Sequence, residues 1–230
     1  MSDVTGWAAS SERGLATKEA NHRFANHLAL LAGYVRVRAA DLAQQSAAPN
    51  LAEVQLLLES LHSQIIATSR LHRTLTLNSD SSRVDVKGYL HALCSSFGTL
   101  LEGRIAMIED IPPGCTVGSD RILSLTQIVS ELVTNAAKHA YAEGKSGSIL
   151  VRGNCDPAGS VVIEVADNGP GLPDGLDLGK SSGLGLELIR TLLGRLGARV
   201  EFDSSPAGLS VRLIVPAGTE ERTPDAFRRP

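Results

Sequence analysis

The sequence has few aromatic residues, no excess of basic charge and no long apolar run. Each of these shortages excludes a kind of core, partner or membrane segment. Aromatic residues make up 3% of the 230 residues and apolar residues 43%, so the cores must be built from aliphatic side chains. A net charge of -3 leaves no basic excess for binding nucleic acid phosphates or anionic lipid. No apolar run approaches the roughly 18 residues that span a bilayer, and no secretory signal pattern opens the chain. We therefore expect a cytoplasmic protein with no membrane segment and no nucleic acid partner.

Cysteine is also scarce, and its three positions are far apart. Cys94, Cys115 and Cys155 form an odd set with wide spacing. Such a set predicts neither a disulfide framework nor a zinc site. A reduced, cytosolic protein is the simplest interpretation.

Two long helical patterns occupy the first third of the chain. Their apolar residues recur every three or four positions, which puts one apolar stripe along each helix. The stripes comprise Phe24, Leu28, Leu31, Val35 and Leu42, and then Leu51, Val54, Leu58, Leu61, Ile65 and Leu75. Pro49 and Asn50 mark the turn between the helices, with Asn50 as a candidate N-cap. Two helices bury two stripes poorly, so the pattern favours a homodimer that forms a four-helix bundle, with packing on the same chain as the alternative.

From about residue 83 the pattern changes to alternating strands and helices. We expect helices over 87–101, 119–141 and 184–196, and strands over 83–86, 104–109, 148–154, 160–166, 199–202 and 209–215. This order predicts an α+β fold in which helices cover one face of a mixed sheet. The polar tail after Pro216 is expected to be disordered.

The first candidate site is the loop VADNGPGLPDG, residues 165–175. Asp167 stands at the end of an apolar strand, where its carboxylate could accept a hydrogen bond from an exocyclic amine of a ligand. Gly169 and Gly171 follow, and glycines let backbone approach a flat ligand closely. Alone, however, D-N-G is equally a common turn.

The second candidate site is the segment SSGLGLELIR, where a loop becomes a helix. Gly183 and Gly185 flank Leu184 at the start of that helix. The first turn of a helix has unpaired N–H groups and a positive dipole end, which suit a phosphate. The alternative is simple bending of the chain before a core helix. The segment lacks the lysine of a P-loop, so the Walker fingerprint does not apply.

The third candidate site is the helix ELVTNAAKHAY, residues 131–141. Glu131, Asn135 and His139 follow one another at steps of four, and Lys138 adjoins that face. An acid, an amide and cations on an otherwise apolar helix can hold a magnesium ion and phosphates, because magnesium needs few protein ligands. A solvated helix face is the alternative for any one of these residues.

The fourth candidate site is EANHRFANHL, residues 19–28. On an ideal helix, His22 points away from the apolar stripe, with Asn26 and Glu19 on the same face. An exposed neutral imidazole is a competent nucleophile. The alternative is a surface histidine with no role.

These four segments together, in this order, resemble a sensor histidine kinase of the HWE-like class, whose phosphoacceptor helix reads H-R-x-x-N. The resemblance extends from Glu19 to Pro216. It implies a dimerisation and histidine phosphotransfer hairpin over 12–78, a GHKL ATP-binding α/β sandwich over 83–216, and a tail over 217–230.

The resemblance also implies roles for single residues. His22 corresponds to the phosphorylated histidine, and Asn26 to the asparagine of the same motif. Arg23 stands where the commonest histidine kinases have an acidic residue, so Glu19 and Glu131 are both candidates for the general base. Asn135 is the expected magnesium ligand. The residues implied to contact the nucleotide are Asn135, Lys138, His139, Asp167, Gly169, Gly171, Gly183, Leu184, Gly185 and Ser210.

The implied function is an ATP- and Mg²⁺-dependent protein histidine kinase. It would autophosphorylate His22 and pass the group to an aspartate of a response regulator receiver domain. No sensor domain precedes residue 19, so we expect the input from a partner protein or from a part of the protein missing from this chain. Two alternatives stay open: a phosphotransfer scaffold that does not use ATP, and a GHKL serine kinase that acts on a regulatory protein.

Overall fold

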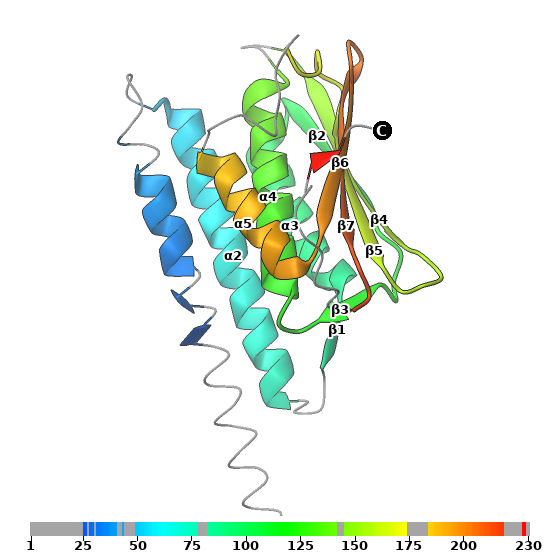
Figure 1. Ribbon diagram of the computed structural model, residues 1–230. Helices are drawn as coiled ribbons and strands as arrows, with labels where there is room; N and C mark the ends of the chain where they lie inside the picture. Colours follow the sequence, from blue (N-terminus) through cyan, green and yellow to red (C-terminus); the bar gives the residue numbers. More distant parts are fainter. Residues whose placement is uncertain are drawn as a thin grey trace, which may run out of the picture.

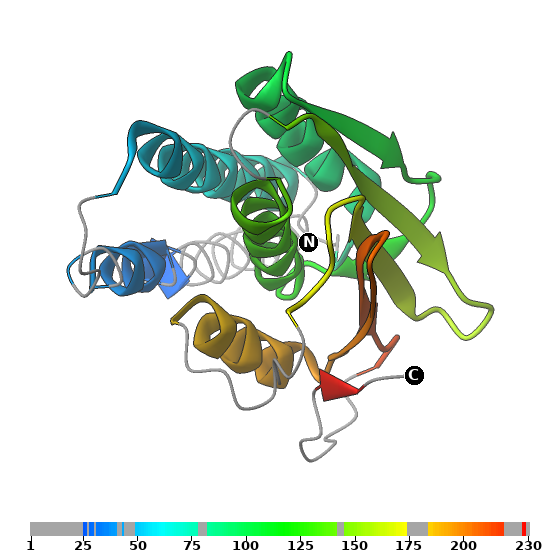
Figure 2. The ribbon, with the colours of Figure 1, turned by 90° about the horizontal axis from the view of Figure 1, so that it is seen from above.

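The computed structural model describes residues 25–26, 28–29, 31–40, 43, 49–77, 82–141, 145–173, 184–218 and 227–228. Residues 31–40 are helical and lie beside the long helix α2 (Leu51–Leu77), so the N-terminal part is a helical hairpin (Figures 1 and 2). The start of α2 is a capping box. The Glu53 amide donates to Asn50 Oδ1 at 2.9 Å, and the Asn50 amide donates to Glu53 Oε2 at 3.0 Å. The predicted N-cap is therefore confirmed.

The second part is a mixed sheet. Its six strands lie in the order β2-β4-β5-β7-β6-β8. They span Ile105–Asp110 (β2), Gly147–Cys155 (β4), Val161–Asp167 (β5), Arg199–Ser205 (β6), Gly208–Val215 (β7) and Phe227–Arg228 (β8). The β2–β4 and β6–β8 pairs are parallel, and the other pairs are antiparallel. A separate two-stranded sheet pairs β1 (Arg83–Asp85) with β3 (Thr116–Gly118).

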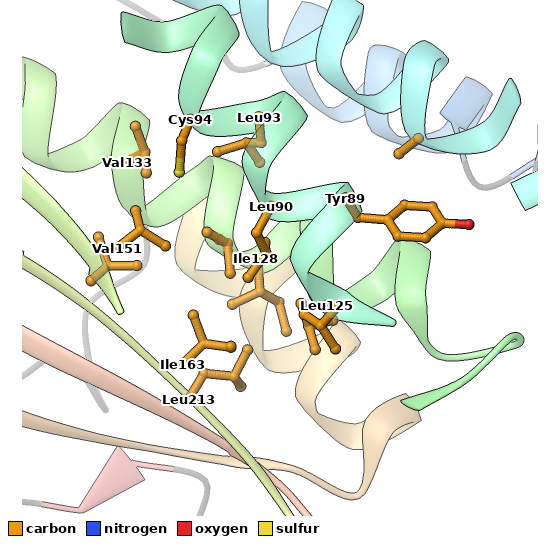
Figure 3. Packing of buried hydrophobic residues seen from close by; sticks show 14 of the residues in the cluster. Tyr89, Leu90, Leu93, Cys94, Leu125, Ile128, Val133, Val151, Ile163 and Leu213 are labelled. Carbon is orange, nitrogen blue, oxygen red and sulfur yellow. The ribbon is translucent and has the colours of Figure 1, made fainter. Parts of the chain in front are cut away.

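Three helices cover one face of the large sheet, as Figure 2 shows. They are α3 (Val86–Leu101), α4 (Ile122–His139) and α5 (Leu184–Leu196). Between helices and sheet lies an aliphatic core in which Leu90, Ile128, Ile163 and Leu213 are fully buried (Figure 3). Each such side chain contributes roughly 1.5–3 kcal/mol when it leaves water. This core fixes α4 on the sheet and so determines where the polar residues at its C-terminal end lie.

The expected α+β fold is confirmed, with differences in detail. The strand β3 is absent from the expected elements, and its three residues lie between the Pro-Pro-Gly sequence at 112–114 and α4. The strand β8 lies within the tail that was expected to be disordered, and it pairs with Val200 and Glu201 of β6. Among the described helices, none combines the length and apolar character that a membrane crossing requires.

The cysteine expectation is wrong for two of the three residues. Cys115 and Cys155 form a disulfide with Cα atoms 5.7 Å apart. The two residues are 40 positions apart in the sequence, and they meet only because Cys115 leads into β3 while Cys155 ends β4. Cys94 is free and buried, and burial raises the pKa of its thiol to about 12.

Candidate nucleotide site

The C-terminal half of α4 carries the predicted acid and amide side chains. Glu131 is only 1% exposed, whereas Asn135 and Lys138 are half-buried one and two turns further on. His139 ends the helix. Desolvation, together with the neighbouring Lys138, lowers the pKa of His139 below its ordinary value, although Glu53 opposes the shift. The imidazole is therefore neutral at neutral pH, and Lys138 is the cation that this end of the helix offers to a phosphate.

The loop after β5 is held in place from several sides. Asp167 Oδ1 accepts from the Gly169 amide at 2.9 Å and from the Leu209 amide at 3.4 Å. Asn168 Oδ1 accepts from Tyr141 Oη at 2.8 Å and from the Ser148 amide at 2.9 Å. Tyr141 follows α4 in the sequence, so these bonds fix the loop against the end of that helix. The half-buried carboxylate of Asp167 thus has a defined position beside α4.

Glycine is required at three positions around this loop. A Cβ on Gly169 would lie 2.6 Å from the backbone oxygen of Ala140, just beyond α4. Gly171 has a φ of 74°, and its Cβ would meet the backbone oxygen of Ser205. Gly208 has a φ of 142°, and its Cβ would meet the backbone oxygen of Asp167. Neighbouring backbone segments thus lie too close for a side chain at Gly169 and Gly171, the two glycines that the sequence singled out. Gly208 is a third such position, which the sequence pattern did not indicate.

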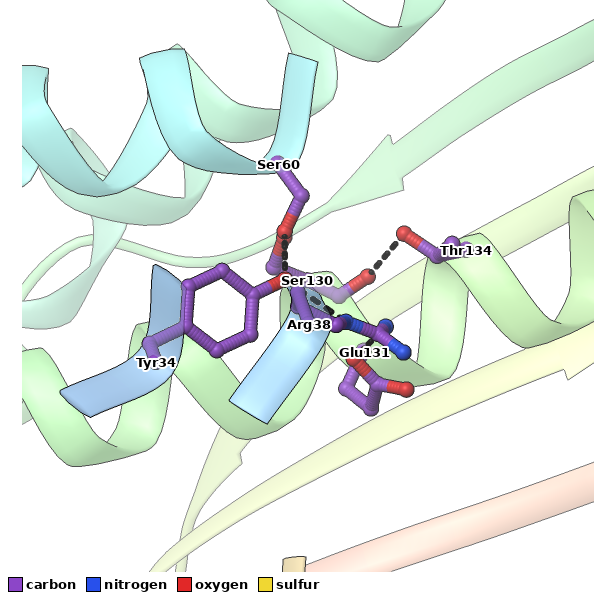
Figure 4. Close-up of polar contacts among 6 residues, drawn as sticks. All are labelled: Tyr34, Arg38, Ser60, Ser130, Glu131 and Thr134. Carbon is purple, nitrogen blue, oxygen red and sulfur yellow. Dashed lines mark hydrogen bonds and ion pairs between the residues drawn. The ribbon is translucent and has the colours of Figure 1, made fainter. Parts of the chain in front are cut away.

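The start of α5 packs on α4. A Cβ on Gly185 would meet Glu131 Oε1, so the helix start lies close to that carboxylate, and a larger residue there would displace the Glu131 side chain. Glu131 is itself bound to Arg38 of the N-terminal helical segment (Figure 4). The start of α5 thus lies beside Glu131, and the Asp167 loop lies beside Ala140 just beyond the same helix, so both contact α4.

The remaining predicted site residues are placed as follows. Ser210 lies opposite Ala166 on β7, next to the Asp167 loop, and its hydroxyl donates to Glu164 Oε1 at 2.7 Å. Asn26 is exposed in the helical segment. Glu19, His22 and Gly183 lie outside the described residues, and nothing is described of the side chain of Leu184.

The arrangement suits a nucleotide. A half-buried carboxylate beside close-packed glycines can bind a flat base with an exocyclic amine, and the helix start and Lys138 can face phosphates. In the described part of the chain, no group of three or more His, Cys, Asp or Glu side chains could hold a metal ion. Magnesium itself prefers few protein ligands and can take phosphate oxygens and waters.

Two known families match this chain. Residues 19–101 match the family described as Histidine kinase, and residues 120–219 match the family described as Histidine kinase-, DNA gyrase B-, and HSP90-like ATPase. Sensor histidine kinase PdtaS of Mycobacterium tuberculosis is 29% identical over 223 residues, which are 92% of this chain and 42% of that protein. Blue-light-activated histidine kinase 2 of Erythrobacter litoralis is 25% identical over 229 residues, which are 95% of this chain and 63% of that protein. The chain thus spans less than two thirds of the length of these relatives.

A solved structure is similar in fold. The histidine kinase domain from Erythrobacter litoralis EL346 blue-light activated histidine kinase aligns with a TM-score of 0.66 at 21% identity. The alignment covers 91% of this chain and 94% of that one, so the similarity includes both the hairpin and the sheet.

Proposed function

The chain belongs to the histidine kinases of two-component signalling, and from this premise we propose that it transfers the γ-phosphoryl group of ATP to His22. The group then passes to an aspartate on the receiver domain of a response regulator. The observation that carries the proposal is the Asp167 loop, which is fixed beside α4 by glycines that pack on neighbouring backbone. The matched ATPase family implies ATP binding, and the loop offers the carboxylate that would accept from the adenine amine.

Magnesium fits the proposed site through Asn135. This amide is half-buried one turn beyond Glu131 on α4, on the side of the helix where α5 begins. A single amide oxygen together with phosphate oxygens and waters meets the coordination preference of the ion. The chemistry that bound magnesium supplies is neutralisation of phosphate charge. Lys138 adds a second positive charge from the protein itself.

The transfer step forms a bond between an imidazole nitrogen of His22 and the γ-phosphorus, and it breaks the bond from that phosphorus to the bridging oxygen of ADP. The other ring nitrogen then loses its proton to a base, for which Glu19 and Glu131 are the candidates. Exposed positions support access to His22. Ala29 and Ala40 are both exposed, and on an ideal helix they share the face of residue 22.

The chemistry of the product tests this proposal. Wild-type protein incubated with γ-labelled ATP and Mg²⁺ should take up label that survives base and is lost in acid, as a phosphorus–nitrogen bond requires. Acid-stable label on a partner protein would contradict the proposal and would favour the serine kinase. Absence of nucleotide binding in a titration would favour the phosphotransfer scaffold instead.

We also propose that the hairpin forms a homodimer. On α2, Leu51, Leu58 and Ile65 are 73%, 59% and 53% exposed, and they recur every seven residues. On the first helical segment, Leu28 and Val35 repeat at the same interval and are 45% and 43% exposed. These positions of the predicted apolar stripes are thus left open by their own chain, whereas Tyr34 and Arg38 on the adjacent face of the segment are buried. Stripes of period seven on two adjacent helices suit a four-helix bundle with a second copy.

Leu58→Arg is expected to weaken this dimer at least about tenfold, because it replaces an aliphatic contact worth more than 1 kcal/mol with a charge that must be desolvated. Light scattering coupled to size exclusion, over a range of protein concentrations, measures the shift to monomer. Ile108→Arg is the matched control, since Ile108 is 48% exposed but lies on β2, outside the hairpin. If both variants remain as dimeric as the wild type, the stripes are not the interface.

A further inference from the structure

Tyr141, the second residue after α4, bridges the place where β5 leaves β4. The last residue pair of these strands joins Ile149 to Asp167, so their backbone pairing stops before Ser148 and Asn168. The Asn168 side chain takes the place of the next backbone partner, since its Oδ1 accepts from the Ser148 amide at 2.9 Å. Tyr141 Oη lies 2.5 Å from the carbonyl oxygen of Ser148 and 2.8 Å from Asn168 Oδ1. The same hydroxyl accepts from the Asn168 amide at 3.3 Å, so it joins both chains where the Asp167 loop begins.

The ring of Tyr141 is confined as well as its hydroxyl. Tyr141 is 7% exposed, and a Cβ on Gly147 would overlap the ring. Glycine at position 147 therefore lets the ring lie directly against the start of β4. The preceding residue, Ala140, is in close contact with Gly169 of the loop. Because the ring has no room to move toward β4, the position of its hydroxyl is defined.

The hydroxyl keeps its proton at neutral pH. Desolvation raises the pKa of Tyr141, and the Asp167 carboxylate adds to the rise, although the hydrogen bonds to Asn168 and Ser148 oppose it. A protonated hydroxyl can donate to one of the two nearby oxygens while it accepts from the Asn168 amide. The repulsion between Tyr141 and Asp167 also shows that the loop carboxylate lies near this hydroxyl.

The position of the Asp167 carboxylate depends on the residues that follow it. Its Oδ1 accepts from the Gly169 amide, which lies directly beyond Asn168 in the same turn. The second partner of Oδ1, the Leu209 amide, is more distant at 3.4 Å. A shift of the chain at Asn168 would therefore move the Gly169 amide and turn the carboxylate with it. The bonds from Tyr141 to Asn168 oppose such a shift.

We propose that Tyr141 is a positioning residue that makes the nucleotide site selective for adenine. It acts through Asn168 and Gly169 to hold the Asp167 carboxylate in the orientation that accepts from an exocyclic amine. The inference rests on the proposed ATP-binding function. It names a residue that controls the affinity and the base selectivity of that site without contacting the nucleotide.

Tyr141→Phe tests this role, because it keeps the ring against Gly147 and removes only the hydroxyl. We expect the ATP affinity to fall by about three- to tenfold, the usual effect of one lost neutral hydrogen bond, and the ratio of ATP to GTP affinity to fall with it. The rate of His22 labelling at saturating ATP should stay at the wild-type value. A purely structural role would lower the melting temperature and leave the KM for ATP and the affinity ratio unchanged. Tyr89→Phe is the matched control, since Tyr89 is also 7% exposed but lies on α3 and contributes nothing to the proposed site.

Two further variants keep the test decisive. Asn168→Ala removes the acceptor that Tyr141 and Ser148 share, from an exposed position, so it tests the same contact should Tyr141→Phe fail to fold. In an Asp167→Asn background, Tyr141→Phe should change the affinity ratio little further, because the tyrosine acts through that carboxylate. Wild-type affinity and selectivity in both Tyr141→Phe and Asn168→Ala, or fully additive effects in the Asp167→Asn background, would overturn the proposal. Wild-type protein that binds no ATP would contradict the proposed function instead, so the two failures are distinguishable.

Discussion

The His22→Ala variant is expected to take up no base-stable label from ATP, because the imidazole is the atom group to which the phosphoryl becomes bonded. The variant leaves no imidazole at the position to which the phosphoryl group is delivered, so the loss should exceed about a hundredfold. The measurement is label per protein after separation under alkaline conditions, at saturating ATP and Mg²⁺. ATP affinity, measured separately, should be unchanged, since His22 lies in the hairpin sequence and not among the residues proposed to bind nucleotide.

The chain offers a matched control for this experiment. His27 follows five residues later in a repeated A-N-H sequence, so His27→Ala removes the same side chain from the same segment. We expect His27→Ala to label like the wild type. Equal labelling of wild type and His22→Ala would show that the phosphoacceptor is a different residue.

Local patterns predicted the parts of the site that lie on single elements. The α4 segment was detectable because its apolar residues recur with the helical period. Glu131 and Asn135 stand four positions apart on the same helix. The Asp167 loop was detectable because a run of alternating apolar residues ends in D-N-G-P-G, and only glycine tolerates such close packing there. In both places the chemistry and the secondary structure are encoded by neighbouring residues, so no knowledge of the tertiary fold was needed.

Contacts between distant segments could not be predicted in this way. Arg38 and Glu131 are bound to each other but lie 93 positions apart in the sequence. Their pairing depends on how α4 packs on the hairpin, which no local pattern encodes. The same holds for the Cys115–Cys155 disulfide and for Gly208, whose need for glycine arises from the backbone of Asp167 across a strand pair. The burial of Tyr34, on the face next to the predicted apolar stripe, is a further consequence of the same packing.

Asp167→Asn is expected to weaken ATP binding by roughly 10- to 100-fold, which corresponds to the loss of one charge-assisted hydrogen bond of about 1.5–3 kcal/mol. The wild-type carboxylate is an acceptor only, and Oδ1 already binds the amides of Gly169 and Leu209. The second oxygen is thus the one left for an adenine amine. An asparagine that keeps its oxygen on those amides must present an NH₂ group to that amine, and two donors repel each other. Labelling of His22 should fall in proportion at low ATP and recover at saturating ATP.

Discrimination between nucleotides gives this prediction a second, independent readout. Guanine presents a carbonyl oxygen where adenine presents its amine, so the wild-type carboxylate should reject GTP, whereas the amide of Asp167→Asn should accept it more readily. The ratio of ATP to GTP affinity, from competition titrations, is therefore expected to fall in the variant. Asp203→Asn is the control, because Asp203 is an exposed carboxylate on β6 of the same sheet. If Asp167→Asn changes neither the ATP affinity nor the ratio of ATP to GTP affinity, the D-N-G sequence is only a structural turn. The tightly packed glycines around it would then need an explanation other than a base-binding pocket.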